Sequence, residues 1–162
     1  MVPVIACLKQ YPAELDTCIV VTAQHRQMLD QVLDVFGVFP DHDLDTMQPR
    51  QSLTEITVRT LARLEPVFDS ESPDLVVVQG DTTTAFAGGL SAFYHQLPVA
   101  HVEAGLRTRN KDSPYPEEMN RQLVDVLADL CYAPTLTAEA ALLAEGIPEA
   151  RILVTGNTVI DA

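Results

Sequence analysis

Apolar and polar positions along the chain follow two alternating patterns, one typical of buried strands and the other typical of helices. Short apolar runs predict strands at residues 17–23, 74–79, 98–103, 130–133 and 151–154. Apolar residues spaced three and four positions apart predict helices at residues 24–36, 52–69, 82–95, 116–130 and 135–145. Ser52 and Glu55 have the spacing of a capping box, and Gly37 ends the helix before it. Because strands and helices alternate, the sequence predicts an α/β fold with right-handed crossovers and a doubly wound parallel sheet.

The two ends of the chain depart from this alternation. Apolar residues between Pro3 and Tyr11 predict an opening helix that is entered through a proline. A strand usually precedes such a helix and lies in the middle of the sheet, and without it the neighbouring strands lack hydrogen-bond partners. We therefore expect that the first strand belongs to an upstream segment or is supplied by another chain. Residues 156–162, GNTVIDA, predict the start of a further helix, so the chain is expected to be truncated at both ends.

Composition narrows the class of protein. The chain has 162 residues, the size of one domain, and 47% of them are hydrophobic and 20% charged. With a mean hydropathy of +0.10, this composition supports a buried core and excludes intrinsic disorder. Asp and Glu number 23 against 10 Lys and Arg, for a formal net charge of -13. Such a negative field repels phosphate backbones and anionic lipid, so we expect neither nucleic acid nor a membrane as a partner.

The cysteines and the apolar stretches indicate a cytoplasmic protein. Cys7, Cys18 and Cys131 stand far apart, without a CxxC pair or a neighbouring histidine at metal-ligand spacing. We interpret them as buried thiols in a reducing compartment and predict no metal site. No apolar stretch is long enough to span a membrane, and no basic region followed by an apolar one opens the chain.

Polar residues at the ends of the predicted strands are the candidates for function, because ligands of parallel sheets bind beyond the carboxyl ends of the strands. Asp81 follows the strand at 74–79 and precedes a helix, within the segment GDTTT. One interpretation is that Asp81 caps that helix, while the threonines satisfy nearby amides. The other is that its carboxylate faces a ligand, beside a helix N-terminus that suits an anion.

The segment HVEAGLRT, at residues 101–108, ends the next strand. Glu103 at the end of a buried strand requires a partner, because an unpaired buried carboxylate is costly. Arg107 could supply a structural ion pair, and the alternative is that Glu103 is a catalytic carboxylate. His101 is better explained as a hydrogen-bonded core histidine than as a ligand.

Two further polar segments have both a structural and a functional explanation. Glu117 and Glu118 follow Pro116 in a predicted first helical turn, where the helix dipole favours acids whatever their function. Residues 22–26, TAQHR, either cap the following helix or contact a ligand. The sequence lacks the motifs GxGxxG, GxxxxGKS/T and GxSxG, which argues against a dinucleotide-binding fingerprint, a P-loop and a serine hydrolase.

Six segments occur in one order along the chain: VTAQHRQMLDQVL, QPRQSLTEIT, GDTTT, HVEAGLRT, SPYPEEMNR and TGNTVIDA. This series closely resembles the non-hydrolysing UDP-N-acetylglucosamine 2-epimerases, over nearly the whole chain. The resemblance implies a two-domain fold of the GT-B type, with the substrate in the cleft between the halves. It also implies that residues 1–162 are the Rossmann-like N-terminal domain, without the first strand that carries the family's GTRPE segment and without the UDP-binding C-terminal domain.

The resemblance implies an enzyme that interconverts UDP-GlcNAc and UDP-ManNAc by inversion at C2. The C2 proton has no adjacent carbonyl to acidify it, so UDP leaves first and a carboxylate stabilises the positive charge that grows on the ring. UDP then adds back to the intermediate, 2-acetamidoglucal, with protonation on the other face. Asp81, Glu103 and Glu117 match the family's carboxylates and are assigned jointly to these steps, with no cofactor and no metal.

Other residues match family segments that have binding roles. The predicted substrate-binding residues are His101, Arg107, Glu118, Asn120 and Arg121. A second site, at which substrate activates the bacterial enzymes, is matched by Gln24, His25 and Arg59, although Met28 stands where relatives commonly have glutamine. Arg59 is explained equally well as a solvated helix residue. The resemblance further implies a cytoplasmic homodimer that serves the biosynthesis of cell-envelope polysaccharides.

Two alternatives stay open. The chain could be a non-catalytic remnant, or a half of the enzyme that folds or dimerises without turnover. It could instead belong to a GT-B glycosyltransferase, which shares the architecture but requires an acceptor. An epimerase converts UDP-GlcNAc without an acceptor, so an assay distinguishes these two enzymes.

Overall fold

Strands and helices alternate along the part of the chain that the computed structural model describes, residues 1–22, 31 and 33–160. The helices are α1 (Val2–Leu8), α3 (Leu53–Glu71), α4 (Thr83–Tyr94), α5 (Glu117–Leu127) and α6 (Leu136–Ala144). The strands are β1 (Val20–Val21), β2 (His42–Asp43), β3 (Val76–Gln79), β4 (Val99–Val102), β5 (Leu130–Ala133) and β6 (Ile152–Val154). Two short 3₁₀ helices span Glu149–Arg151 and Thr158–Ile160.

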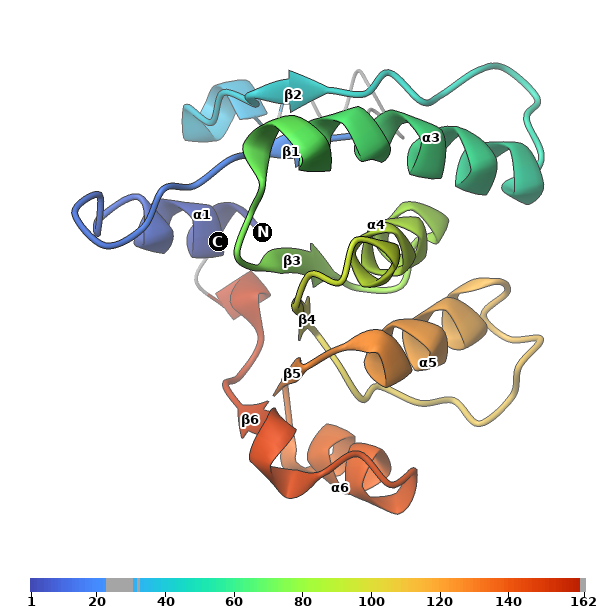
Figure 1. Cartoon of the computed structure of the whole chain (residues 1–162). Coiled ribbons are helices and arrows are strands. Elements are labelled where there is room, and N and C mark those ends of the chain that lie inside the picture. Colours follow the sequence, from blue (N-terminus) through green and yellow to red (C-terminus); the bar gives the residue numbers. More distant parts are fainter. Residues whose placement is uncertain (23–30, 32, 161–162) are drawn as a thin grey trace.

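Four of the strands form one sheet in the order β3-β4-β5-β6, and each of its strand pairs is parallel. β4 lies inside this sheet and is buried along its whole length. Figure 1 shows α4 and α5 next to each other on one side of the sheet, with α1 on the other side. The predicted α/β fold with a parallel sheet is confirmed, and every strand and helix that the sequence predicts between residues 52 and 154 is present.

β1 and β2 form a separate, two-stranded parallel sheet. Of the strand predicted at residues 17–23, only Val20 and Val21 pair with a neighbour. Within the described residues, β1 pairs only with β2, and β3 pairs only with β4. One edge of β1 and one edge of β3 therefore carry no strand from this part of the chain. The expectation of a further strand beside them stays a prediction.

Helix α3 begins where the sequence predicts. The Ser52 hydroxyl accepts a hydrogen bond from the backbone N–H of Glu55 at 3.2 Å, and the Glu55 carboxylate accepts one from the backbone N–H of Ser52 at 2.7 Å. These bonds satisfy two backbone groups that have no partner within the helix, so the predicted capping box is confirmed. The helix ends at Glu71, because Ser72 adopts a left-handed backbone conformation with φ of 47°.

The predictions for the N-terminal part hold only in part. α1 carries Pro3 in its first turn, as predicted. Residues 31 and 33–36 are helical, and Gly37, with φ of 62°, ends that segment. The rest of the helix predicted at residues 24–36 lies outside the described residues, and so do Gln24, His25 and Met28. At the other end of the chain, Thr158–Ile160 forms a 3₁₀ turn where the sequence predicts the start of a helix.

Two apolar clusters hold these elements together. The larger cluster joins the four-stranded sheet to its helices, and its buried members include Leu64, Phe68, Val99, Val124 and Leu142. The smaller cluster packs α1 against the segment around β1, through Ile5, Ile19, Leu33 and Val38. None of the helices in the described part of the chain combines the length and the apolar composition that crossing a bilayer requires.

The cysteines differ from the prediction that all three are buried. Cys131, in β5, is buried, and its burial raises the pKa of its thiol to about 12. Cys7 and Cys18 are exposed, so the prediction is wrong for both. The reason is their position, because Cys7 lies on the outer helix α1 and Cys18 precedes the short strand β1, outside the main core.

Candidate functional site

The ends of β3 and β4 and the start of α5 converge at one edge of the sheet. Asp81 lies two residues beyond β3, and Glu103 directly follows β4. A Cβ atom at Gly80 would lie 3.6 Å from Oε2 of Glu103, so the two strand ends touch. Asn120, in the first turn of α5, donates a hydrogen bond from Nδ2 to the backbone oxygen of Asp81 at 2.9 Å. The tertiary structure therefore gathers the three segments that carry the predicted carboxylates.

Asp81 does not cap the helix that follows it. The cap of α4 is Thr82, whose hydroxyl accepts a hydrogen bond from the backbone N–H of Ala85 at 3.1 Å. The predicted cap at Asp81 is therefore wrong by one residue, because Thr82 has the extended backbone that a cap needs. The Asp81 carboxylate instead forms an ion pair with Nη2 of Arg121, and its side chain stays 28% exposed.

Glu103 has a strained backbone. Its φ of 68° lies in the left-handed region, which costs a non-glycine residue on the order of 1–3 kcal/mol. Oε1 accepts a hydrogen bond from Nε2 of Gln79 at 3.0 Å, and the side chain is half-buried. Strain of this kind concentrates at active sites and ligand clamps, because the surrounding structure must hold it in place. This feature separates Glu103 from an ordinary residue at the end of a strand.

Arg107 is not the partner of Glu103. Its Nη2 lies 2.7 Å from Oδ2 of Asp125 and 2.6 Å from Oε2 of Glu145, and its Nε donates to Glu145 Oε1 at 2.8 Å. Burial by itself lowers the pKa of Arg107, but the two carboxylates outweigh burial and raise the pKa above its ordinary value. The predicted ion pair between Arg107 and Glu103 is wrong, because the chain turns at residues 103–105 and directs Arg107 toward α5 and α6.

His101 is the hydrogen-bonded core histidine that the sequence favours. It is fully buried, its Nδ1 lies 2.6 Å from Oδ1 of Asp125, and its Nε2 lies 2.9 Å from the backbone oxygen of Gly80. Asp125 also accepts a hydrogen bond from the backbone N–H of Gly105 at 3.1 Å. One buried carboxylate thus holds β4, the turn after it and Arg107 in place. His101 contacts the end of β3, next to Asp81, and is a positioning residue in this arrangement.

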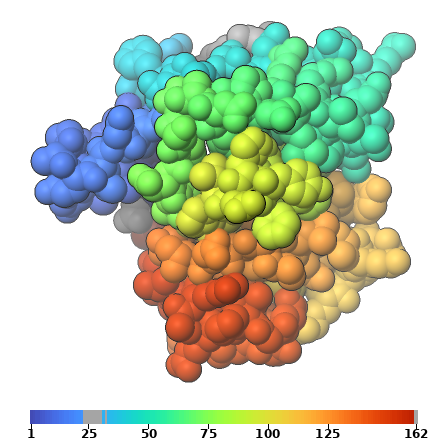
Figure 2. Space-filling model, in the orientation of Figure 1, coloured from blue at the N-terminus to red at the C-terminus, as the bar shows by residue number. Residues whose placement is uncertain are grey.

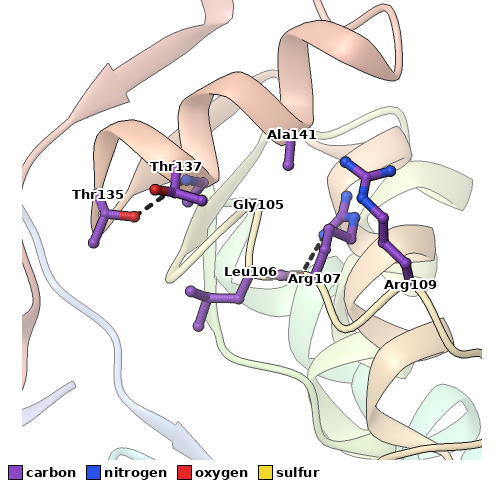
Figure 3. Close-up of a pocket in the computed structure, with 8 residues that line it drawn as sticks. Gly105, Leu106, Arg107, Arg109, Thr135, Thr137 and Ala141 are labelled. Carbon is purple, nitrogen blue, oxygen red and sulfur yellow. Dashed lines mark hydrogen bonds between the residues drawn. The ribbon is translucent and has the colours of Figure 1, made fainter.

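The turn after β4 also packs tightly against α6. A Cβ atom at Gly105, whose φ is 82°, would lie 2.4 Å from the backbone oxygen of Ala138, so only glycine fits there. Beside this contact lies a cavity of about 180 Å³ between residues 105–109 and the start of α6. Figure 3 shows Arg107, Arg109 and Thr135 around it. None of the three predicted catalytic carboxylates lines this cavity, so we do not assign the chemistry to it.

Glu118 is fully buried, and its carboxylate accepts several hydrogen bonds. The helix dipole alone does not explain a buried acid at this position. Its carboxylate accepts hydrogen bonds from the backbone N–H groups of Thr108 and Arg109, both at 3.0 Å, and from Nη1 of Arg121 at 3.0 Å. Gln122 adds a further hydrogen bond at 3.1 Å. Burial alone raises the pKa of Glu118, but the backbone hydrogen bonds from Thr108 and Arg109, helped by side chains, lower it below the ordinary value. Glu118 therefore fastens the loop at residues 108–109 to α5.

The lowered pKa of Glu118 predicts sensitivity to acid. A carboxyl group whose pKa is lower in the folded state stabilises the fold above its unfolded-state pKa near 4.5, and that stabilisation is lost as the pH falls through the folded-state pKa. We expect Glu118→Gln to be less stable than wild type at about pH 7, with a gap that narrows toward about pH 3. Urea denaturation across this range measures the gap. The matched control is Glu65→Gln, an exposed residue of α3, and an unchanging gap for Glu118→Gln would contradict the prediction.

Glu117 and Arg121 lie on the same face of α5. Glu117 is the first residue of the helix and is half-buried, and residues four positions apart face the same side. Arg121 pairs with Asp81 and Glu118, and its Nη1 donates to the backbone oxygen of Leu106 at 3.0 Å. Because Arg121 pairs with Asp81, the face of α5 that carries Arg121 and Glu117 lies toward the end of β3.

Sequence reasoning missed two residues that hold the site. Asp125 is buried beneath the turn after β4, and Gln79 donates to Glu103. A signal for Asp125 exists in the sequence, because Glu118, Arg121 and Asp125 are spaced by three and four positions and therefore share one helical face. That spacing indicates a charged network on the buried side of α5. Gln79 has no comparable signal, since it is the last residue of an apolar run.

Arg59, predicted for a second substrate site, lies on α3 and is not simply solvated. It donates hydrogen bonds to the backbone oxygen of Thr46 at 2.8 Å, to Oε1 of Gln51 at 2.9 Å and to Oε1 of Gln48 at 3.1 Å. These contacts fasten the segment between β2 and α3 to the helix. The two other residues predicted for that site, Gln24 and His25, lie outside the described residues.

Comparison with known proteins gives matches along the chain. Residues 8–162 match the family described as UDP-N-acetylglucosamine 2-epimerase. A UDP-N-acetylglucosamine 2-epimerase of Bacillus subtilis is 58% identical over 162 residues, which cover 100% of this chain and 42% of that protein. The Escherichia coli K12 protein of the same name is 53% identical, with 100% and 43% covered.

Solved structures agree with these matches. The Neisseria meningitidis UDP-GlcNAc 2-epimerase bound to UDP-GlcNAc superposes with a TM-score of 0.94 at 50% identity, over 99% of this chain and 44% of that one. The Methanocaldococcus jannaschii enzyme in complex with UDP-GlcNAc and UDP gives a TM-score of 0.92 at 39% identity, over 99% and 43% of the two chains. The chain therefore spans less than half the length of the relatives it matches.

Proposed function

The chain belongs to the UDP-N-acetylglucosamine 2-epimerase family, and from that premise we propose that it supplies the catalytic carboxylates of an enzyme that interconverts UDP-GlcNAc and UDP-ManNAc. The observation that carries the proposal is the convergence of Asp81, Glu103 and the start of α5 at one edge of the sheet. Ligands of parallel sheets bind at this edge. We further propose that residues 1–162 form the Rossmann-like N-terminal domain of a GT-B-type enzyme, since relatives of more than twice this length contain the matching segment.

The proposed chemistry needs groups that exchange protons and stabilise positive charge. UDP leaves C1 first, and the electron pair of the C1–O bond departs with it while positive charge develops on the sugar ring. A carboxylate beside the ring stabilises that charge, and a base then removes the C2 proton to give 2-acetamidoglucal. Return of the proton to the other face of C2 and re-addition of UDP at C1 complete the inversion. We assign these steps jointly to Asp81, Glu103 and Glu117.

The surroundings of two of these carboxylates suit the proposed roles. The ion pair with Arg121 holds the Asp81 carboxylate in a fixed place at the end of β3, where it can face the sugar ring. Glu103 has one oxygen bound by Gln79, while the other lies toward Gly80, where the absence of a side chain leaves room. Its strained backbone is consistent with a side chain that the fold directs for function.

All five residues predicted to bind substrate are engaged in internal contacts. His101, Glu118, Asn120 and Arg121 are buried, and the Arg107 side chain is only 3% exposed. We propose that these five act on the substrate site through the segments they hold, at residues 80–81 and 103–109. Such a role makes the site rigid before the substrate arrives, which catalysis by pre-organised charge requires.

We also propose that the enzyme is a homodimer. α4 and α5 expose large apolar side chains on neighbouring surfaces, and Phe93, Tyr94 and Val126 are 57%, 66% and 71% exposed. Figure 2 shows the two helices on one face of the molecule, α4 in yellow and α5 in orange below it. Exposed apolar surface of this kind is typical of protein interfaces. Three free cysteines suit a reducing compartment, so we place the enzyme in the cytoplasm. From the family alone we propose that its product serves cell-envelope polysaccharide synthesis.

A chimera tests the proposed activity. In it, this chain replaces the matching 42% of the Bacillus subtilis relative. We expect the chimera to convert UDP-GlcNAc to UDP-ManNAc without an acceptor, as measured by separating the two nucleotide sugars. The 162-residue chain alone is expected to show little or no turnover, because it spans less than half of the relative. Release of UDP that depends on an added acceptor would instead support the glycosyltransferase alternative, and wild-type-like turnover by the chain alone would contradict the proposal.

A further inference from the structure

Three side chains with metal-ligating atoms meet far from the strand ends described above. Cys18 precedes β1, His42 opens β2 and Glu71 is the last residue of α3. One ligand atom from each lies within 4.8 Å of the other two, and Nε2 of His42 is 2.7 Å from Oε1 of Glu71. The sequence predicts no metal site, because these residues are widely separated along the chain. The fold alone brings them together.

We propose that Cys18, His42 and Glu71 form a binding site for a zinc ion. Thiolate, imidazole and carboxylate are the protein ligands of Zn²⁺, and a thiolate disfavours the hard cations Mg²⁺ and Ca²⁺. Zinc–ligand bonds of about 2.0–2.3 Å in a tetrahedron place the ligand atoms roughly 3.4–3.6 Å apart. The side chains of His42 and Glu71 are 32% and 39% exposed, so both have room to rotate toward that geometry. Water fills the fourth position.

The charge around the cluster favours a cation. Asp16 lies two residues before Cys18 in the chain, and Oδ2 of Asp41 accepts a hydrogen bond from the backbone N–H of Ile19, the residue after Cys18, at 2.7 Å. The chain as a whole carries a formal net charge of -13. When Zn²⁺ binds, the sulfur keeps the electron pair of its S–H bond and forms the Zn–S bond, and the thiol proton passes to solvent. The added positive charge is then surrounded by acids.

The location of the cluster indicates a structural role. Cys18 and His42 lie at the starts of parallel strands, and Glu71 ends the helix that leads into β3, whereas the candidate catalytic residues follow the opposite ends of the strands. Figure 1 shows β1 and β2 alongside α3, with the end of α3 on the side where β2 begins. A bound ion would fasten the two-stranded sheet to α3. The alternative explanation is a simple hydrogen bond between His42 and Glu71, with Cys18 as a bystander.

Zinc titration distinguishes these explanations. The protein is freed of metal with a chelator, titrated with ZnCl₂ by calorimetry under reducing conditions, and then analysed for bound zinc. We expect one zinc ion per wild-type chain, and a Kd at least about 10-fold higher for Cys18→Ser and for His42→Gln. Cys7→Ser is the matched control, because Cys7 is also an exposed thiol but lies outside the cluster, and it should bind like wild type.

Two further measurements distinguish loss of a zinc ligand from a variant that simply folds poorly. Co²⁺ in place of Zn²⁺ should give a thiolate charge-transfer absorption band in wild type and Cys7→Ser, and none in Cys18→Ser. Zinc at a hundredfold excess over the Kd should raise the melting temperature of wild type by about 5 °C or more. It should raise the melting temperature of Cys18→Ser by at most about half as much, because the same zinc concentration is then no more than about ten times the Kd of that variant. Equal zinc affinity in wild type and Cys18→Ser, or no stoichiometric zinc in wild type, would overturn the proposal.

Discussion

Replacing Asp81, Glu103 or Glu117 with its amide is expected to lower turnover of the chimeric enzyme by roughly 100-fold or more. Each amide keeps the shape of the acid but loses its charge and its ability to accept a proton. If the carboxylates stabilise the positively charged ring or transfer the C2 proton, losing the charge raises the energy of the transition state. Substrate binding is then affected much less. We therefore expect kcat to fall while KM changes little.

The measurement is steady-state conversion of UDP-GlcNAc by Asp81→Asn, Glu103→Gln and Glu117→Gln in the chimera. Glu65→Gln is the matched control, because Glu65 is an exposed acid on α3 and has no part in the proposed site. Exchange of the C2 proton with deuterium from solvent gives a second readout. Wild-type rates for all three variants would contradict a chemical role for these residues. Only the structural explanations, such as a position next to a helix cap or in the first turn of a helix, would then stand.

The three variants should differ in stability, which separates chemistry from folding. Asp81→Asn weakens the ion pair with Arg121, a residue that also binds Glu118, so its loss of activity is expected to come with a loss of stability. Glu117 is half-buried and opens α5. Glu117→Gln is therefore expected to retain near wild-type stability, and its activity is the cleanest test of a chemical role.

The largest effect on stability is expected for Asp125→Ala, which should lower the free energy of unfolding by about 3–5 kcal/mol. The Asp125 side chain is 1% exposed and contacts Nδ1 of His101, the backbone N–H of Gly105 and Nη2 of Arg107. Alanine leaves these donors buried without their acceptor, and it removes the charge that partly balances Arg107. Breaking a buried charged network from one side costs more than the network contributes as a whole.

Urea denaturation, followed by circular dichroism at neutral pH, measures this loss. Asp69→Ala is the control, because Asp69 is exposed on α3 and its replacement should change stability by less than about 0.5 kcal/mol. Asp125→Asn should fall between the two, since an amide oxygen still accepts one of the hydrogen bonds. A change below about 1 kcal/mol for Asp125→Ala would mean that solvent or Glu145 replaces Asp125, and would contradict its anchoring role.

The strands and helices between residues 52 and 154 follow from the sequence, because their signals are local. The capping box at Ser52 and Glu55 satisfies backbone groups within one helical turn, and it forms as predicted. His101 was placed correctly as a core histidine for a similar reason, since it lies within an apolar run that becomes the buried strand β4. The series of motifs also led to the family that the comparisons support.

The pairings between side chains did not follow from the sequence. Arg107 is four residues from Glu103, yet it binds Asp125 and Glu145, because the turn at Gly105 redirects the chain. Cys18 was predicted to be buried because cysteine usually is, but the short strand β1 leaves it at the surface. In each case the outcome depends on which distant element packs against the residue.

The sequence by itself determined the order of elements between residues 52 and 154, the parallel sheet and the segments in which the acids lie, because periodicity and caps act over a few residues. It did not predict the short strand β2 at His42–Asp43. Only the tertiary structure decided that Arg121 pairs with Asp81, that Glu118 holds the loop at residues 108–109 and that Cys18, His42 and Glu71 meet. The physical reason is that ion pairs and ligand sites depend on distances of a few ångströms between residues far apart in the chain. Those distances are set by how strands and helices pack, and no local pattern encodes them.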